Sequence, residues 1–440
     1  MSNTVDIDAP PIDSTSPLNV DAIRADFPIL ERSIASGTQL IYLDNAASTQ
    51  RPNQVIEAMS SCYRKYYSNV HRGIHTLSEA STQAYEEARQ MVASFLNAAS
   101  TKEIIFTAGT TAAINTVAKS WGAANLHRGD VVLLPLSEHH ANIVPWHQLA
   151  EQTGCVVKWI SIDDEHLISD DEVIAALERH RPKLFAFGAA SNTLGTEYPV
   201  TRWSQLAHEF GATVLVDAAQ AAPHAPIDVA AWDVDFLVFS GHKVCGPTGI
   251  GVLYGREALL DAMPPFLGGG GMIDTVTEDG FTCHVLPEKF EAGTPPIAEA
   301  IGLAAALDYL QSVGLEKIHA HEKMLGGRID AGLRDIEGVR LIGPTANHKA
   351  GINSFVIDGI HAHDVSQFLD TRGVAVRAGH HCTMPLHKSL GLAATTRASC
   401  YLYNTVDEAD TFLQAVTDVK AKFARSGRRR RPRRAGSNSN

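Results

Sequence analysis

The sequence predicts an α/β protein built on a mainly parallel sheet, and three observations lead to this fold class. Between residues 130 and 254, apolar segments short enough to be buried strands recur along the chain. Helical segments are expected between them at 142–153, 171–180 and 201–210, a rhythm typical of βαβ units. Polar side chains follow four of the apolar segments at the point where each strand is expected to end, and this is the edge at which open α/β sheets bind ligands.

These four strand ends carry the side chains of a cofactor site. Residues 131–135 lead to Glu138 through Asn142, 184–187 to Ser191 through Thr193, 212–216 to Asp217 through Gln220, and 235–239 to Ser240 through Gly251. The last segment places Lys243 beside Ser240 and His242. A lysine at the exit of a buried strand is costly unless it is paired or reactive. The alternative is a surface lysine whose stem lies along apolar surface.

Composition indicates an ordinary soluble protein of two domains. The chain has 440 residues, of which 45% are hydrophobic and 20% charged. No apolar run is long enough to span a bilayer, and the polar, acidic N-terminus shows no secretory signal. Six scattered cysteines without a CxxC pair indicate reduced thiols and a cytoplasmic location. The net charge is −12 although seven arginines lie in the C-terminal tail, so nucleic acid is not expected as a partner.

The remaining elements are expected in the following order. Residues 1–19 are rich in Ser, Asp and Pro and are predicted to be disordered, as is the Arg-rich tail 425–440. A short helix and turn at 21–30 precede a large domain at 38–298, with a helix at 79–96 and a strand at 104–106. The domain change is placed near a helix at 298–310, and a smaller α/β domain follows at 299–424.

Two loops are candidate sites on chemical grounds. Gly109-Thr110-Thr111 opens a helix, where hydroxyls and free backbone N–H groups make an anion site; the alternative is a simple threonine cap. Cys382 lies in a polar loop, where a thiol is accessible for nucleophilic attack. The alternatives are a chance surface cysteine or a zinc site with His380 and His381, although consecutive ligands cannot easily surround one tetrahedral ion.

Eight motifs together resemble the type II cysteine desulfurases, the SufS family, within the class V aminotransferase group of fold type I pyridoxal-phosphate (PLP) enzymes. They run in the family's order from about residue 20 to about 424. They are Tyr42 to Ser48, His71 to His75, Gly109 to Thr111, His139 to Trp146, Asp217 to Gln220, Ser240 to Gly251, Phe290 to Pro295 and Arg377 to Cys382. The resemblance implies a large PLP-binding domain, a small domain that carries the cysteine loop, and an N-terminal arm at 20–37 that packs with the small domain.

The resemblance also assigns roles to residues around the cofactor. Lys243 corresponds to the lysine that binds PLP covalently and later moves a proton. The other cofactor ligands implied are Asp217 at the ring nitrogen, Gln220 at the phenolic oxygen, His139 on the ring face, Thr111, Ser240 and His242 at the phosphate with Thr110 adjacent, and Thr294 reaching across from the second subunit of a homodimer. No metal ligand is implied.

The implied reaction converts L-cysteine to L-alanine. Asn192 and Arg397 correspond to groups that hold the substrate carboxylate, and Arg377 either joins them or supports the cysteine loop. Cys382 corresponds to the thiol that takes the sulfur as a persulfide and passes it to an acceptor for iron–sulfur assembly. His363 is typical of the branch served by a zinc-containing SufU-type acceptor, whereas other relatives use a SufE-type acceptor. A histidine at a helix start that makes only local hydrogen bonds is the alternative for His363.

Two other functions remain open from the sequence. One is a selenocysteine lyase or another class V β-eliminating enzyme, which would share the PLP site and differ in how the chalcogen leaves. The other is a catalytically silent sulfur-transfer scaffold that kept the fold. The presence of Lys243, Asp217, Cys382 and Arg397 together argues against a silent scaffold.

Overall fold

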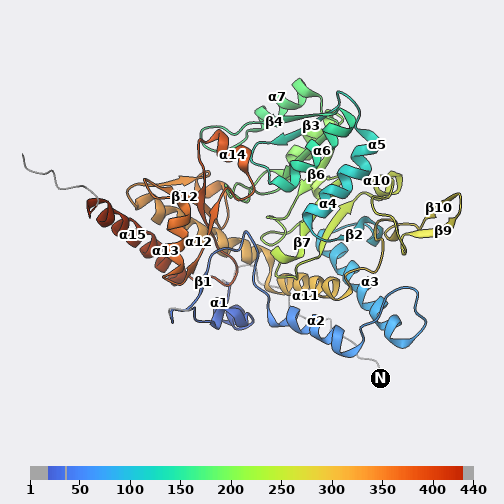
Figure 1. Cartoon of the computed structure of the whole chain (residues 1–440), viewed down its shortest axis with the longest axis horizontal. Coiled ribbons are helices and arrows are strands. Elements are labelled where there is room, and N and C mark those ends of the chain that lie inside the picture. Colours follow the sequence, from blue (N-terminus) through green and yellow to red (C-terminus); the bar gives the residue numbers. More distant parts are fainter. Residues whose placement is uncertain (1–17, 35–36, 430–440) are drawn as a thin grey trace, which may run out of the picture.

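A seven-stranded sheet forms the centre of the larger domain in the computed structural model, which describes residues 18–34 and 37–429 (Figure 1). The predicted disorder at 1–19 and 425–440 lies outside these residues except at 18–19 and 425–429. The strand order is β2-β8-β7-β6-β5-β3-β4. The five strands from β7 to β4 are parallel, β8 runs antiparallel to β7, and β2 runs antiparallel to β8. The bounds are β2 Ile104–Thr107, β3 Val131–Pro135, β4 Val156–Ile160, β5 Leu184–Gly188, β6 Thr213–Asp217, β7 Phe236–Ser240 and β8 Gly251–Gly255.

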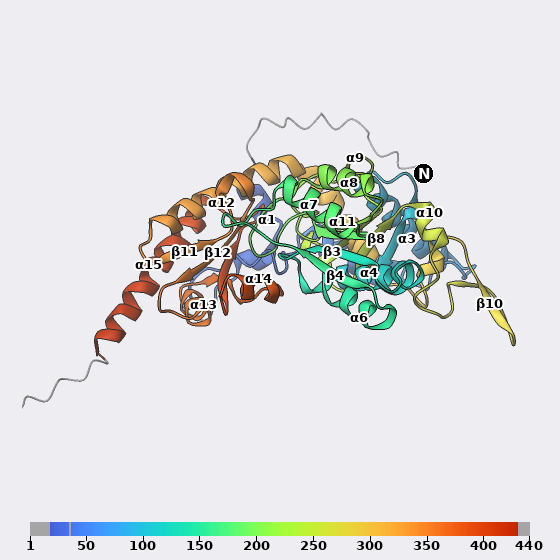
Figure 2. The ribbon, with the colours of Figure 1, turned by 90° about the horizontal axis from the view of Figure 1, so that it is seen from above.

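Helices cover both faces of this sheet, as Figure 2 shows. Successive side chains of β5 alternate between two cores: Phe185 and Phe187 pack on one face, and Leu184 and Ala186 on the other. This explains why the strands read as continuous apolar runs. The helices of this domain are α2 Asn53–Lys65, α3 Thr76–Leu96, α4 Thr110–Val117, α5 Ala123–Asn125, α6 Val144–Thr153, α7 Asp170–His180, α8 Val200–Glu209, α9 Val229–Trp232, α10 Glu257–Ala262 and α11 Ile297–Val313. The hairpin of β9 (Ile273–Thr277) and β10 (Gly280–Cys283) projects at the end far from the small domain.

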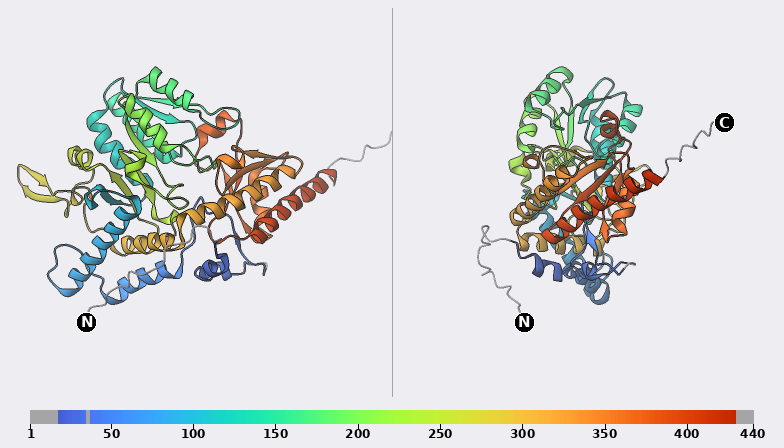
Figure 3. Two further views of the ribbon diagram at one scale, coloured as in Figure 1. Left: turned by 180° about the vertical axis from the view of Figure 1, so that it is seen from behind. Right: turned by 90° about the vertical axis from the view of Figure 1, so that its left-hand side faces the viewer.

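The smaller domain is built on an antiparallel sheet of order β11-β12-β15-β14. Its strands are β11 Val339–Ile342, β12 Ile352–Ile357, β14 Arg377–Gly379 and β15 Thr395–Ser399, and its helices are α12 Leu315–Asp335, α13 Ala362–Asp370, α14 Met384–Ser389 and α15 Val406–Arg429. Helix α15 continues to Arg429, so the expected end of regular structure at 424 falls five residues early. Figure 3 shows α15 along the outer side of this domain.

The division between the domains differs from the one expected at 298. Strand β1 (Ile41–Tyr42) pairs in parallel with β13 (Val374–Ala375), and Ile41 and Leu43 belong to the core of the small domain. Helix α11 packs against α2 and α3 of the large domain. We therefore place the domain change at Gly314, between α11 and α12, because a boundary at 298 would cut off a helix from the helices that cover it.

The N-terminal arm joins the two domains. Helix α1 (Val20–Ala25) brings Arg24 within 2.9 Å of Glu408, at the start of α15. Phe27 packs against the rings of Tyr309 on α11 and Tyr403 after β15. The arm thus contacts the last helix of the large domain as well as the small domain. Within the described ranges, no helix combines the length and hydropathy needed to cross a membrane.

A buried ion pair ties α3 to the segment that precedes α11. Two nitrogens of Arg89 lie 2.7 and 2.9 Å from the carboxylate oxygens of Glu291. The same carboxylate accepts hydrogen bonds from the Phe106 backbone N–H and the Tyr85 hydroxyl, both at 2.8 Å. The Arg89 side chain is 1% exposed and that of Glu291 6%. This carboxylate therefore satisfies four donors around a charge that water does not reach.

We expect Glu291→Gln to destabilise the large domain by about 3 kcal/mol or more, because the buried Arg89 charge then keeps only the partly exposed Glu86 carboxylate as a counter-charge. The control is Glu86→Gln, which removes the other carboxylate beside Arg89; the Glu86 side chain is 42% exposed, so its loss should cost less than about 1 kcal/mol. Urea unfolding followed by tryptophan fluorescence measures both variants. Equal losses of unfolding free energy in the two variants would contradict this account.

Candidate active site

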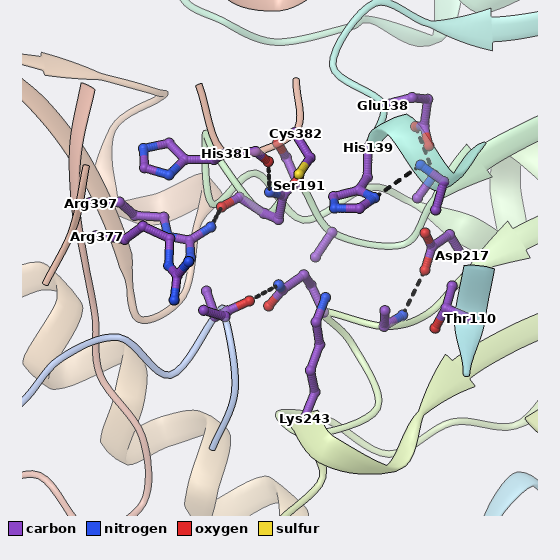
Figure 4. Close-up of a pocket in the computed structure, with 18 of the residues that line it drawn as sticks. Thr110, Glu138, His139, Ser191, Asp217, Lys243, Arg377, His381, Cys382 and Arg397 are labelled. Atoms are coloured by element: carbon purple, nitrogen blue, oxygen red, sulfur yellow. Dashed lines mark hydrogen bonds between the residues drawn. The ribbon is translucent and has the colours of Figure 1, made fainter. Parts of the chain in front are cut away.

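A pocket of about 730 Å³ lies at the carboxyl edge of the parallel strands, where the small domain closes over it (Figure 4). Every residue predicted for the site except Thr294 lines this pocket: Thr110, Thr111, His139, Asn192, Asp217, Gln220, Ser240, His242, Lys243, His363, Arg377, Cys382 and Arg397. Thr294 is exposed, on the segment between β10 and α11. The pocket also includes Tyr198, which the sequence analysis does not name, and Glu138, Ser191, His380 and His381, to which it assigned no cofactor or substrate contact.

Lys243 lies in a short turn directly after β7, with its side chain directed into the pocket (Figure 4). The turn is tight, because a Cβ at Gly241 would lie 2.9 Å from the carbonyl oxygen of Pro247. Burial, opposed by the nearby charge of Asp217, lowers the pKa of Lys243 to about 8. About a tenth of the amine is therefore neutral at pH 7, far more than for an ordinary lysine, and the neutral amine is the form that acts as a nucleophile or a base.

Two buried carboxyl groups stand across the pocket from Lys243. Asp217 ends β6 and accepts a hydrogen bond from the Ala219 N–H at 2.9 Å, and burial raises its pKa while Lys243 opposes this. Glu138 accepts the Gly188 N–H and the Asn142 side-chain amide, each at 2.8 Å, and burial raises its pKa to about 8. One carboxylate oxygen of Asp217 accepts a hydrogen bond from the protein, whereas both oxygens of Glu138 do, so Asp217 is the better placed of the two to accept from a ligand.

His139 follows β3 and is held by its own backbone. Its Nδ1 accepts the Ala141 N–H at 3.1 Å, so that nitrogen carries no proton. Burial and the charge of Lys243 lower the pKa of His139 to about 3. The imidazole is therefore a neutral, flat surface at one side of the pocket, which suits stacking on an aromatic ligand.

The start of α4 presents hydroxyl and backbone N–H groups to one end of the pocket. Ser240 Oγ accepts the Thr110 N–H at 2.8 Å and lies 2.7 Å from Thr110 Oγ1. Gly109, at φ 139°, lets the chain enter the helix beside Gly251, where a Cβ would lie only 2.4 Å from Gly109 Cα. Free N–H groups and hydroxyls at a helix N-terminus favour a phosphate group. His242, which lines the same pocket, has its pKa lowered to about 4 by burial.

The opposite end of the pocket holds two arginines around Asp44. Arg397 on β15 is 2% exposed, and it donates to the Asn192 carbonyl at 2.8 Å and lies 3.5 Å from Asp44. Arg377 makes a two-pronged contact with Asp44, at 3.0 and 2.6 Å. The Asn192 side-chain amide donates to the His381 carbonyl at 2.7 Å. Arg377 and the Asn192 amide are thus engaged with protein groups here, whereas Arg397 Nε has no hydrogen-bond partner among the described residues.

The cysteine loop connects β14 to α14 and leaves Cys382 exposed at the pocket. His381 and Cys382 have positive φ angles of 50° and 60°, a conformation that residues with a Cβ rarely adopt. The three consecutive side chains of the zinc alternative do not converge. His380 Nδ1 accepts the Cys382 N–H, while His381 is buried with Nε2 at 2.9 Å from Thr395 Oγ1. No group of three or more potential metal ligands is found in the described part of the chain.

His363 lies at the start of α13, on the rim of the pocket. It also lines an adjoining groove of about 590 Å³ with Asp44, Ser366, Gln367, Asp370 and Arg377. The side chain is exposed, and its backbone N–H donates to His361 Nδ1 at 3.2 Å. His363 is therefore outside the buried part of the site and lines the same pocket as Cys382.

The pocket fits pyridoxal phosphate. It combines an amine at Lys243, an anion site at the start of α4, a carboxylate at Asp217 and a flat ring at His139. Gln220 supports the fit, because its buried Oε1 has no hydrogen-bond partner among the described residues while its amide nitrogen donates to the Ala46 carbonyl at 2.7 Å. A buried polar atom without a partner in a pocket indicates a place for a polar ligand.

The family model "Aminotransferase class-V" matches residues 41–412 of the chain. A cysteine desulfurase of Haloferax volcanii is 46% identical over 94% of this chain and 100% of its own length. A probable cysteine desulfurase of Synechocystis sp. is 50% identical over 90% of this chain and 94% of its own.

Among solved structures, the apo structure of a cysteine desulfurase from Thermococcus onnurineus NA1 is 40% identical with a TM-score of 0.86, covering 92% of this chain and 99% of that chain. These likenesses confirm the predicted fold of type I PLP-dependent enzymes, with its mainly parallel sheet and smaller second domain. The chain belongs to the class-V aminotransferase family, and within it to the cysteine desulfurases, which are PLP enzymes.

Proposed function

We propose that this enzyme converts L-cysteine to L-alanine, keeps the sulfur on Cys382 as a persulfide, and passes it to an acceptor that supplies iron–sulfur cluster assembly. One observation carries the proposal: a half-buried lysine of lowered pKa and an exposed cysteine from the other domain line the same pocket. The lysine suits covalent cofactor binding and proton transfer, and the cysteine can reach both the pocket and a partner protein.

We assign each PLP contact to the residue whose side-chain chemistry suits it. Asp217 would hold the ring nitrogen, His139 the ring face and Lys243 the aldehyde carbon. Thr110, Thr111, Ser240 and His242 would bind the phosphate and Gln220 the phenolic oxygen. When bound, PLP withdraws electrons from the substrate Cα and Cβ, so that a proton and then sulfur can leave. Thr294 is exposed and lies outside this pocket. This position would suit a residue that completes the phosphate site of the second subunit in a homodimer.

The substrate carboxylate would bind at Arg397. Its Nε is buried without a partner and its Nη2 is only weakly engaged with Asp44 at 3.5 Å, so the guanidinium retains donors for a carboxylate. Arg377 is already paired with Asp44, and Asn192 holds the cysteine loop through His381. We therefore assign binding of the substrate carboxylate to Arg397. Arg377 would hold Asp44 in place, and Asn192 would contact the substrate only after its amide releases the His381 carbonyl.

Sulfur leaves by attack of Cys382 on the substrate. Lys243, as a neutral amine, takes the proton from the substrate Cα. The Cys382 thiolate then attacks the substrate sulfur, so that an S–S bond forms and the Cβ–S bond breaks. The electron pair of the broken bond stays with the substrate, whose Cβ takes up a proton. Lys243 then returns the proton to Cα, and alanine leaves. The sulfur stays on Cys382 as a persulfide.

The acceptor would approach over His363 and the groove beside it. A neutral histidine nitrogen is a good zinc ligand, so His363 could replace a thiolate on a zinc-bearing acceptor of the SufU type and free that thiolate to take the sulfur. A SufE-type acceptor without zinc would not need this residue. The six cysteines form no disulfide, which suits the reducing cytoplasm that this thiol chemistry requires.

Lys243→Ala should abolish covalent cofactor binding and turnover, because the amine that holds the aldehyde is gone. Borohydride reduction of the wild-type holoenzyme, followed by peptide mapping, should label Lys243. The control Lys102→Ala removes an exposed lysine, 53% accessible, and should leave labelling and turnover intact. A cofactor label on another lysine would show that the assignment is wrong.

Cys382→Ser should still bind PLP and L-cysteine but lose alanine release, because a hydroxyl does not attack sulfur at neutral pH. Cofactor spectra on adding L-cysteine and alanine assays measure the two steps separately. Cys283→Ser, at a half-exposed cysteine on the distant hairpin, is the control and should behave as wild type. Normal alanine release by Cys382→Ser would remove the persulfide role and favour the selenocysteine lyase alternative.

His363→Ala should abolish the stimulation of desulfuration by a zinc-bearing acceptor, so that the ratio of stimulated to basal activity falls to one. The reason is that the incoming zinc ligand is missing. His348→Ala, an exposed histidine elsewhere on the small domain, should retain stimulation. The hypothesis fails if His363→Ala is stimulated like wild type, or if only a zinc-free acceptor stimulates the wild-type enzyme.

A further inference from the structure

His140, the residue after His139, holds the cysteine loop by two hydrogen bonds. Its backbone N–H donates to the Cys382 carbonyl at 2.7 Å. Its imidazole Nε2 accepts the Met384 N–H at 3.1 Å. The two contacts lie on either side of the peptide units that follow Cys382, and Met384 is the first residue of α14. One residue of the large domain thus fixes both the end of the loop and the start of the next helix.

The imidazole contact requires a particular protonation state. A backbone N–H can only donate, so His140 Nε2 must be an unprotonated acceptor and the ring must be neutral, with its proton on Nδ1. Burial and the neighbouring ring of His380, 5.5 Å away, lower the pKa of His140 and so favour this form. The titratable groups around the ring are His380 and Cys382 from the loop and His139 from its own turn.

The backbone of the cysteine loop is strained, and hydrogen bonds to the loop must offset the free energy of that strain. His381 and Cys382 both have left-handed backbone conformations, each of which costs about 1 kcal/mol or more outside glycine. Bonds from Asn192 to the His381 carbonyl and between Thr193 and Thr383 also hold the loop. The bonds from His140 hold the peptide units directly after Cys382.

We propose that His140 is a positioning residue that holds Cys382 over the pocket through the acceptor nitrogen of its imidazole. His139 and His140 are consecutive, so the residue assigned to the cofactor face and the residue that holds the thiol share one turn. A single neutral hydrogen bond at a half-buried site is weak, and the loop can therefore open when the thiol must reach an acceptor. We call the two hydrogen bonds from His140 to the loop the clamp. The reason for holding the thiol rests on the proposed role of Cys382, whereas the existence of the clamp does not depend on that role.

Hydrogen–deuterium exchange of the holoenzyme tests the clamp without measuring turnover. His140→Phe keeps a ring of similar size and removes the acceptor, so a peptide spanning residues 380–390 should exchange about two- to tenfold faster at Met384, the range expected for one lost hydrogen bond. His140→Gln offers an amide oxygen as acceptor and should restore slow exchange. A peptide from α11 reports on global folding and should be unchanged in both variants.

Two results would overturn the proposal. One is unchanged exchange of the 380–390 peptide in His140→Phe. The other is equal acceleration in His140→Phe and His140→Gln, which would mean that ring packing matters and the acceptor does not.

If His140→Phe unfolds, the comparison of wild type with His140→Gln at falling pH decides the matter. Protonation of His140 should accelerate exchange at Met384 in the wild type beyond the change in His140→Gln, which lacks this imidazole and keeps every other histidine around the loop. An identical pH response of the two proteins, after correction for the intrinsic pH dependence of exchange, would show that His140 does not hold the loop through its imidazole.

Discussion

The contact between the small domain and the carboxyl edge of the large sheet is the interaction on which the active site depends. Neither domain contains the site alone, because Lys243 and Asp217 lie at strand ends of the large domain while Arg397 and Cys382 belong to the small domain. Hydrogen bonds across the boundary are short and involve backbone groups, from Arg397 to the Asn192 carbonyl and from Asn192 to the His381 carbonyl. In both bonds the donor is a side chain that we assign to the substrate carboxylate, so the same two side chains also join the domains.

Burial of charged groups at this boundary shifts their pKa values. The pKa of Lys243 falls to about 8 and that of Arg397 to about 10, because burial disfavours both cations. Asp217 and Asp44 stand beside them and keep part of the charge balanced. A lysine that is partly neutral can bind a carbonyl and move a proton, whereas an arginine that stays charged can hold a carboxylate. The same pocket thus uses its two cations for different tasks.

The sequence predicted the strand ends, and nearly all of the proposed ligands lie where the parallel strands bring them together. It predicted less well what each side chain contacts. The pairing of Arg377 with Asp44 joins residues 333 positions apart, and the bond from His140 to Met384 joins residues 244 apart. Local patterns contain no signal for such contacts, because the packing of the two domains decides them. The same reason explains the domain boundary, since only the packing of α11 on α2 and α3 shows where that helix belongs.

The most direct measurement of the central claim is the product balance with L-cysteine. The purified holoenzyme with L-cysteine and a thiol reductant should release alanine and sulfide in equal amounts, because Cys382 removes only the sulfur and the amino acid keeps its amine. Sulfide accompanied by pyruvate and ammonia would contradict the account, since it would mean that the enzyme eliminates sulfur without attack by a thiol. Absence of both alanine and sulfide would contradict it as well, and would favour the silent scaffold.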